Sequence, residues 1–251
     1  VLPVAVRRDL ADYLQVASLI DDEAVLQAVR RYASRVRIDR IECLWEPFMM
    51  RAAKLREVLG IPGMGVAQTH LFRDKEAMKQ ALDAAGLRTP RHVQAGGEAG
   101  IRAAAEVIGF PMVVKPVAGA GSANTHQVRD ATALAHAIAD VGGQVVSVEE
   151  FIEGEEFTFD TVCSDGRILF ENMAWYRPKP ILGRNEEWIS PQTVNLRNID
   201  RPELRAGREL GRRVLDALGF RTGFTHMEWY LTADGEAVFG EIGARPPGGR
   251  S

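Results

Sequence analysis

Residues 111–157 constrain the fold of this chain more than any other stretch. They begin with the apolar run P-M-V-V-K-P-V, in which hydrophobic residues flank Lys115, and this pattern predicts a strand that directs a cation toward an anionic group. The following residues, 119–125, are small and include Gly119 and Gly121. Both glycines permit backbone conformations in which successive N–H groups converge on phosphate oxygens. The sequence therefore predicts a phosphate-binding strand and loop.

The third part of this stretch, V-E-E-F-I-E-G-E-E-F at residues 148–157, predicts a strand that leaves a sheet and turns at Gly154. Exposed backbone there can bind an adenine edge, and a nearby carboxylate can bind ribose hydroxyls. Each part alone has a structural alternative, such as an edge-strand lysine or a hairpin turn. Neither G-x-x-x-x-G-K-[ST] nor G-x-G-x-x-G is present. The order of the three parts favours a nucleotide site.

This order resembles the ATP-grasp superfamily. V-V-K-P is similar to the family's lysine strand, and E-E-F-I-E-G-E-E-F-T is similar to its adenine-binding hinge. Residues 73–82, R-D-K-E-A-M-K-Q-A-L, resemble the segment with its first phosphate-binding lysine. F-T-H-M-E-W and F-G-E-I-G-A-R resemble its two metal-ligand strands, so the matches cover residues 73–249 in the family's order. The resemblance implies an α/β and α+β chain with the ATP-grasp fold, in which two α+β lobes clasp ATP after a partial Rossmann-like preATP-grasp domain.

The resemblance also implies the residues that hold ATP. Glu149 and Ile152 would present backbone to adenine, and Glu156 would bind the ribose. The full set implied for the nucleotide is Lys75, Lys115, Gly121, Ser122, Ala123, Glu149, Phe151, Ile152 and Glu156. For Lys75 the residues alone favour a solvated side chain, and only the resemblance makes it a phosphate ligand.

Two glutamates predict a metal site. The strands 224–231 and 236–242 flank Asp234-Gly235, which predicts a two-residue hairpin turn. In that register Leu231 faces Val238 and Glu228 faces Glu241. Opposed carboxylates repel unless a divalent cation bridges them, and Mg²⁺ (or Mn²⁺) bound to ATP phosphates suits one or two carboxylates. The alternatives are two glutamates on a wet face, or a changed register if the loop length is odd.

The chain departs from the family pattern at Gly243, where many members have an asparagine that binds the metal. The E-I-G-A-R form resembles the branch that contains L-amino-acid ligases. In that branch the arginine, here Arg245, contacts the substrate or the phosphoryl group, so Arg245 and Lys115 are the implied catalytic residues. His226 is either a proton relay or a structural residue.

Three segments organise the chain in this interpretation. Residues 1–72 are an N-terminally incomplete preATP-grasp domain, residues 73–150 a linker helix and lid lobe, and residues 151–251 a C-terminal lobe that is itself incomplete at its end. Glu46 either caps the helix that follows it or contacts substrate. The irregular residues 175–192 are either a substrate loop, with Arg177 and Lys179 as carboxylate contacts, or a surface loop.

Hydrophobic periodicity locates the elements. Predicted helices cover 21–33, 46–59, 74–85, 101–108, 130–139 and 202–218. Predicted strands cover 1–6, 40–45, 111–117, 145–150, 157–163, 167–174, 224–231 and 236–242.

Composition excludes several classes of function. The net charge of −3 gives no reason to expect a nucleic-acid partner, and no apolar run approaches the roughly 20 residues of a membrane helix. The two cysteines, Cys43 and Cys163, lack metal-like spacing and are interpreted as reduced thiols of a cytoplasmic protein. The five histidines are scattered, which argues against zinc.

The function implied by the resemblance is an ATP-dependent ligase that activates a small-molecule carboxylate as an acyl phosphate and joins it to an amine. Such chemistry requires charge neutralisation more than a covalent nucleophile. The alternatives are a purine-pathway or biotin-carboxylase-like enzyme and a non-catalytic ATP-binding module. A nicotinamide dehydrogenase is disfavoured because the G-x-G-x-x-G turn is missing. A homodimer is left open.

Overall fold

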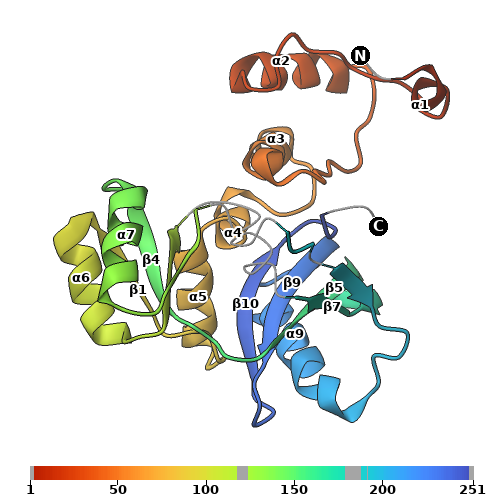
Figure 1. Cartoon of the computed structure of the whole chain (residues 1–251). Coiled ribbons are helices and arrows are strands. Elements are labelled where there is room, and N and C mark those ends of the chain that lie inside the picture. Colours follow the sequence, from red (N-terminus) through yellow and green to blue (C-terminus); the bar gives the residue numbers. More distant parts are fainter. Residues whose placement is uncertain (1–2, 118–123, 179–187, 191, 249–251) are drawn as a thin grey trace.

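Two antiparallel β-sheets with helices packed against them form the body of the chain (Figure 1). The structure is a computed structural model that describes residues 3–117, 124–178, 188–190 and 192–248. The small sheet has the strand order β1-β4-β2-β3, and the large sheet has the order β10-β9-β5-β7-β8, with β6 also paired to β5.

The small sheet contains the predicted lysine strand. Its strands are β1 (His92–Gly96), β2 (Met112–Pro116), β3 (His126–Val128) and β4 (Val145–Glu150), with α6 (Gly97–Ile108) and α7 (Ala131–Val141) against one face. Buried apolar residues of both helices meet those of β2 and β4 in one core. The predicted helices and the strands at 111–117 and 145–150 are confirmed. β1 and β3 were not predicted, because both are short and alternate weakly.

The large sheet is built from the second half of the chain. Its strands are β5 (Glu155–Ser164), β6 (Arg167–Asn172), β7 (Ala174–Arg177), β8 (Gln192–Asn195), β9 (Gly223–Leu231) and β10 (Ala237–Gly243), and η2 (Pro202–Leu204) leads into α9 (Arg205–Ala217) behind them. The predicted strand at 167–174 is divided in two at Met173, which is fully buried. β8 was not predicted, since its residues are all exposed and leave no alternation of apolar side chains.

Helix α9 packs against the sheet through two glycines. Gly207 and Gly211 are four residues apart and therefore share one face of the helix. A methyl group at Gly207 would overlap the ring of Trp229, and one at Gly211 would overlap the ring of Phe159. Both rings are almost fully buried. The missing side chains thus let the helix approach two aromatic residues of the core.

The turn between β9 and β10 differs from the prediction. Leu231 pairs with Ala237 rather than with Val238, because the loop is one residue longer than the predicted two-residue turn. Gly235 adopts a φ of +88° at its end. A three-residue loop that ends in a residue of positive φ is the next most common hairpin connection.

A β-bulge at Gly240 then restores the register farther along the hairpin. The pairing shifts between Phe239 and Glu241, so that Glu241 faces Glu228 as predicted. A Cβ at Gly240 would lie 2.9 Å from the backbone oxygen of Glu228, which explains why glycine suits the bulge. The predicted pair is confirmed, although the predicted turn was wrong.

The first 72 residues contain helices and no strand within the part that the structure describes. The elements are α1 (Val4–Arg8), α2 (Asp22–Ala33), η1 (Glu46–Phe48), α3 (Met49–Leu59) and α4 (Val66–Leu71). The predicted strand at 1–6 is wrong because residues 4–6 lie in α1. The predicted strand at 40–45 is also wrong, because the segment has no neighbouring strand with which to form ladder hydrogen bonds.

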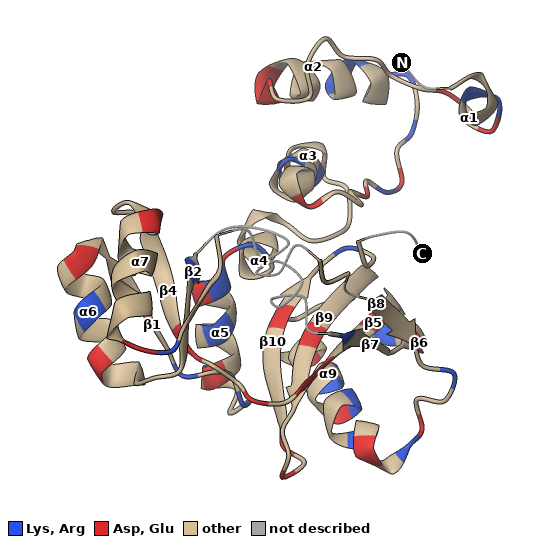
Figure 2. Ribbon diagram, viewed as in Figure 1, with Lys and Arg blue, Asp and Glu red and all other residues tan. Residues whose placement is uncertain are grey.

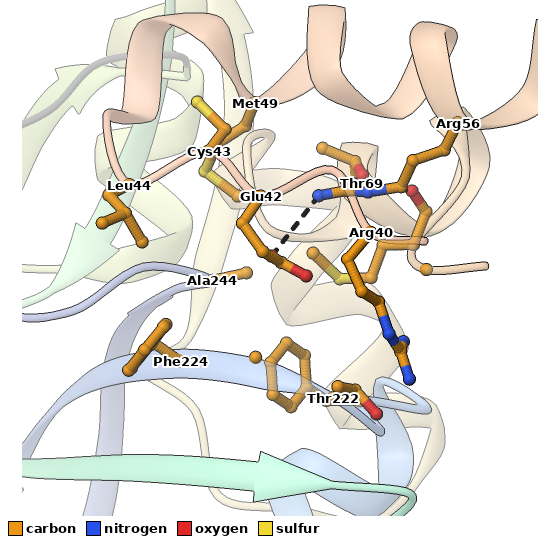
Figure 3. A pocket seen from close by; sticks show the side chains of 14 residues that line it. Arg40, Glu42, Cys43, Leu44, Met49, Arg56, Thr69, Thr222, Phe224 and Ala244 are labelled. Carbon is orange, nitrogen blue, oxygen red and sulfur yellow. Dashed lines mark hydrogen bonds and ion pairs between the residues drawn. The ribbon is translucent and has the colours of Figure 1, made fainter. Parts of the chain in front are cut away.

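Residues 40–44 instead form an irregular segment that lies beside the large sheet (Figure 3). The guanidinium of Arg56 fixes it: Nε donates to the carbonyl oxygen of Ile41 at 2.8 Å, and Nη2 lies 3.6 Å from Glu42. A cavity between this segment and the start of β9 has both Glu42 and Phe224 in its wall.

None of the described helices is long and apolar enough to cross a membrane.

We expect Gly207→Ala to lower the free energy of unfolding by about 1–3 kcal/mol, because the added methyl group forces Trp229 out of its packed position. Urea unfolding followed by circular dichroism measures this. Gly100→Ala in α6 is the matched control, since its methyl would lie 3.9 Å from the nearest atom. The control should stabilise by about 0.5–1 kcal/mol, and equal stability of the two variants would refute the packing explanation.

Candidate active site

Helix α5 (Lys75–Ala84) lies between the two sheets and contacts both (Figure 1). Its N-cap is Asp74, whose carboxylate accepts hydrogen bonds from the backbone N–H groups of Glu76 and Ala77 at 2.9 Å. The backbone N–H of Lys75 donates to the carbonyl oxygen of Val117, just beyond β2, at 3.2 Å. The first turn of α5 is thereby joined to the end of the lysine strand.

The side chain of Lys75 reaches the large sheet. Its Nζ forms an ion pair with Glu241 on β10, and the residue is only 8% exposed. The solvated alternative for Lys75 is therefore wrong. Figure 2 shows basic positions on α5 and acidic positions on β9 and β10.

A cluster of three charges, two of them buried, joins α5 to the small sheet. Glu149 on β4 accepts from Lys115 on β2 at 2.8 Å and from Lys79 on α5. Lys79 is 1% exposed, and the sequence analysis did not single it out as a site residue. Its spacing of four residues from Lys75 was the available indication, because residues at i and i+4 share one side of a helix.

The three charges support one another. Burial opposes ionisation of Glu149, but Lys115 and Lys79 outweigh it and hold the pKa of this carboxyl well below its usual range. Burial likewise disfavours the Lys115 cation, and the Glu149 carboxylate overcomes this and raises the pKa of Lys115. Burial lowers the pKa of Lys79 to about 8. At neutral pH the cluster contains two cations and one anion, and its excess positive charge is suited to a phosphate.

The opposed carboxylates Glu228 and Glu241 are about one-third exposed on the face of the large sheet. Within the described ranges, no group of three or more His, Cys, Asp or Glu side chains is arranged to hold a metal. Two carboxylates are nevertheless the donor set that Mg²⁺ uses when phosphates and water complete its shell. The donor chemistry therefore fits a nucleotide-bound Mg²⁺.

His226 lies beside this acidic pair. Its Nδ1 is 2.6 Å from Asp160 and its Nε2 is 3.6 Å from Glu228. Burial disfavours the imidazolium, but the hydrogen bond to Asp160 and then that to Glu228 outweigh burial and raise the pKa of His226 to about 9. The hydroxyl of Tyr176 lies 3.4 Å from the same Nε2. His226 is thus a fixed cation between Glu228 and the strands β5 and β7.

Arg245 is held by a residue from the N-terminal part of the chain. Its Nε donates to Glu46 at 2.8 Å, and the second oxygen of Glu46 pairs with Arg73. Glu46 is buried and makes no capping hydrogen bond to η1 or α3. The prediction that it caps a helix is therefore wrong.

The predicted hinge residues join the two sheets. The backbone N–H of Phe151 donates to the carbonyl oxygen of Pro111 at 3.3 Å, and Ile152 and Glu156 are buried. Gly121, Ser122, Ala123 and Lys179 lie outside the described residues. The hypothesis that Arg177 contacts a substrate receives no support from its position, since its guanidinium stacks on Trp175 with 4.2 Å to the ring centre.

Residues 80–248, more than half of the chain, match the ATP-grasp domain family. The chain belongs to the ATP-grasp family. Its fold is the ATP-grasp fold. The family resemblance drawn from the sequence is confirmed.

The relatives that match this chain align with most of its length. The L-arginine-specific L-amino acid ligase of Bacillus subtilis is 28% identical over 248 residues, which are 95% of this chain and 59% of the relative. A formate-dependent phosphoribosylglycinamide formyltransferase of Synechococcus is 31% identical over 94% of this chain and 60% of the relative. The crystal structure of an L-amino acid ligase from Bacillus licheniformis superposes with a TM-score of 0.73 at 26% identity, over 90% of this chain and 53% of that one. The chain thus spans between half and two-thirds of these proteins.

We expect Glu149→Gln to flatten the acid limb of the stability profile. The folded-state pKa of Glu149 lies below its ordinary value of 4.5, so its carboxylate stabilises the fold above that pH and loses this contribution as the pH falls below it. Urea unfolding at a series of pH values measures the slope. Glu153→Gln, at an exposed glutamate nearby, is the control and should keep the wild-type slope. The same slope in all three proteins would contradict the buried ion cluster.

Proposed function

We propose that this chain is the ATP-binding part of a ligase that activates an amino-acid carboxylate as an acyl phosphate and joins it to an amine. The observation that supports this most is the position of α5, whose Lys75 meets Glu241 while its Lys79 shares Glu149 with Lys115. Candidate phosphate ligands and candidate metal ligands are thereby adjacent. The relatives named as L-amino acid ligases support the substrate class.

The ion pair between Lys75 and Glu241 would have to separate when ATP and Mg²⁺ bind. A phosphate oxygen would replace Glu241 as the partner of Lys75, and Glu241 would then join Glu228 in holding Mg²⁺. Bound Mg²⁺ would neutralise charge on the transferred phosphoryl group. Lys115 can likewise exchange Glu149 for a phosphate without leaving that carboxylate unpaired, because Lys79 stays beside it.

The reaction requires two displacements. A carboxylate oxygen attacks the γ-phosphorus and ADP leaves; the amine nitrogen then attacks the acyl carbon, phosphate leaves, and the amine loses a proton. Lys75 and Lys115 would offset the charge that develops on the phosphoryl oxygens. Arg245 would hold the carboxylate or the acyl phosphate, and Glu46 fixes the direction of its guanidinium.

The remaining parts of the ATP site follow the family order. The backbone of Glu149, Phe151 and Ile152 would bind adenine, Glu156 would bind the ribose, and Gly121, Ser122 and Ala123 would cover the phosphates. We also propose three segments: residues 1–72 as the preATP-grasp part, 73–150 as linker helix and lid lobe, and 151–251 as the C-terminal lobe.

A second candidate is a purine-pathway activity, because the Synechococcus relative shares 31% identity. A phosphoribosyl substrate requires cations for its phosphate group. A second cavity lies on the large sheet beside His226, and none of the described residues that line it is a lysine or an arginine. Phosphate release from ATP, tested with amino-acid pairs and with ribosyl-phosphate amines, separates the two candidates.

We expect Lys115→Ala to abolish ATP-dependent ligation while the fold persists, because the variant loses a charge-assisted phosphate contact and Lys79 still neutralises Glu149. Nucleotide affinity, product formation and a melting curve test this together. Lys54→Ala, at an exposed lysine that pairs with Asp22, is the matched control and should behave as wild type. Wild-type turnover by Lys115→Ala would rule out the assignment.

We expect Mg²⁺ to bind at least ten-fold more tightly in the presence of a non-hydrolysable ATP analogue. Gly243 offers no side-chain ligand, and Lys75 competes with the metal for Glu241. Isothermal titration measures both states. Lys75→Met removes the cation that competes with Mg²⁺ for Glu241, so it should narrow the difference between the Mg²⁺ affinities with and without the analogue. Glu241→Gln should weaken Mg²⁺ binding in either state and lower activity by orders of magnitude. Tight Mg²⁺ binding that is independent of nucleotide would show that the ligand set is wrong.

A further inference from the structure

The chain enters the small sheet once and leaves it once (Figure 1). Residues 85–91 lead from α5 into β1, and residues 151–154 lead from β4 into β5. The second connection is neither helix nor strand, so its backbone belongs to no regular hydrogen-bonded ladder. It contains Phe151 and Ile152, which we propose as part of the adenine subsite. The direction in which this segment leaves β4 therefore depends on the contacts that hold its first residues.

Arg88 on the first connection holds the residue at which the second one begins. Its Nη1 and Nη2 donate to the two carboxylate oxygens of Glu150, the last residue of β4, at 3.2 and 3.1 Å. A guanidinium that donates to both oxygens of a carboxylate fixes its orientation as well as its distance. The backbone N–H of Arg91 donates to the same carboxylate at 3.0 Å. The side chain of Glu150 is thus held from two positions of the first connection.

These contacts change the ionisation of Glu150. Burial opposes its charged form, but the hydrogen bonds from Arg88 and then from the backbone of Arg91 outweigh burial and lower the pKa of this carboxyl. The side chains of Arg88 and Glu150 are 34% and 24% exposed. A partly shielded pair is screened less by salt than a fully exposed one.

Arg88 is itself anchored to the large sheet. The backbone N–H of Phe239 on β10 donates to the carbonyl oxygen of Arg88 at 2.9 Å. The Nε of Arg88 lies 3.4 Å from Glu236, which directly precedes β10. The neighbouring Leu87 is buried in the core of the large sheet. The guanidinium therefore extends from a backbone that the large sheet already fixes.

The contact between Arg88 and Glu150 is separate from the lysine cluster. Successive side chains of a strand point to opposite faces of its sheet. Glu149 accordingly pairs with Lys79 and Lys115, whereas Glu150 pairs with Arg88. Loss of Arg88 would leave the candidate phosphate ligands in place, so effects on adenine and on phosphate can be measured separately.

We infer that Arg88 is a positioning residue for the adenine subsite and fixes, through Glu150, the backbone of residues 150–152 before the nucleotide binds. The inference rests on the function proposed above, since it takes this segment as the place where adenine binds. A segment that is already fixed loses less conformational freedom when its ligand arrives. Loss of Arg88 should therefore weaken binding of the base and spare the chemistry at the phosphates.

Nucleotide binding to the intact protein tests this role. We expect Arg88→Ala to raise the Kd of Mg-ATP about ten-fold, because binding must then order the adenine segment. The Kd of Mg-tripolyphosphate, which has the phosphates without a base, should stay within about two-fold of the wild-type value. Isothermal titration measures both ligands, and a melting curve verifies the fold. Unchanged ATP affinity, or equal weakening for the two ligands, would overturn the role of Arg88.

Arg88→Lys keeps the inference testable if Arg88→Ala does not fold. A lysine keeps the positive charge but cannot make the two parallel hydrogen bonds of a guanidinium, so the Kd of Mg-ATP should lie between those of the wild type and Arg88→Ala. Wild-type affinity in Arg88→Lys would contradict the contribution that we assign to the paired hydrogen bonds with Glu150.

Further variants show which contact matters. Glu150→Ala removes the same interaction, so its combination with Arg88→Ala should bind ATP no more weakly than the weaker single variant, and additive losses would overturn the inference. Glu236→Ala removes only the contact at 3.4 Å and should keep wild-type affinity. Arg102→Ala, at an exposed arginine of α6 that pairs with Glu98, is the matched control. A loss in Glu236→Ala as large as that in Arg88→Ala would assign the effect to the β9–β10 hairpin instead.

Kinetics distinguish failure of this role from failure of the ligase function. In a ligation assay, Arg88→Ala should raise the KM for ATP about ten-fold and leave kcat within about two-fold, because the contact is the same in the ground and transition states. A fall in kcat with an unchanged KM would overturn the positioning role. If no amino-acid pair yields a dipeptide while Arg88→Ala still weakens ATP binding alone, the ligase function fails and the role of Arg88 stands. Absence of ATP binding by the wild-type protein would overturn both.

Discussion

The buried carboxylate of Glu149 is the interaction on which the arrangement of the site depends. It accepts from Lys79 on α5 and from Lys115 on β2, so one side chain of β4 joins the helix to the lysine strand. Removal of either lysine alone would leave the other to neutralise Glu149, whereas loss of the carboxylate would leave two unneutralised cations side by side, one of them buried. The small sheet and α5 are thereby held together, and the lysines that we propose to bind phosphate lie where they meet.

Lys75 on α5 connects the small sheet to the large one through its ion pair with Glu241. The position of Glu241 opposite Glu228 depends on a single β-bulge. Without the shift at Gly240, the longer turn between β9 and β10 would place Gly240 opposite Glu228, and the two carboxylates would lie on different faces. Packing behind the sheet is equally specific, because α9 approaches Trp229 through a position that has no side chain. Backbone details thus decide where the charged groups meet.

The N-terminal part of the chain contributes to the same site by a different route. Glu46 reaches from η1 to Arg245, 199 residues later in the sequence, and Arg73 occupies its other oxygen. A positioned guanidinium loses less freedom when it binds an anion than a mobile one does.

The sequence by itself determined the local elements and their chemistry. Periodicity and caps located α5 and α7, the order of motifs indicated the family, and alternation placed Glu228 and Glu241 on one face. Tertiary structure alone decided which charges pair. Nothing in the sequence distinguishes Lys79 from a surface lysine, because its burial depends on which other elements pack over the helix. Residues 40–45 have the composition of a strand, but the fold gives them no partner strand. Pairings such as Glu46 with Arg245 span long sequence separations, and no local pattern determines which distant groups the fold brings together.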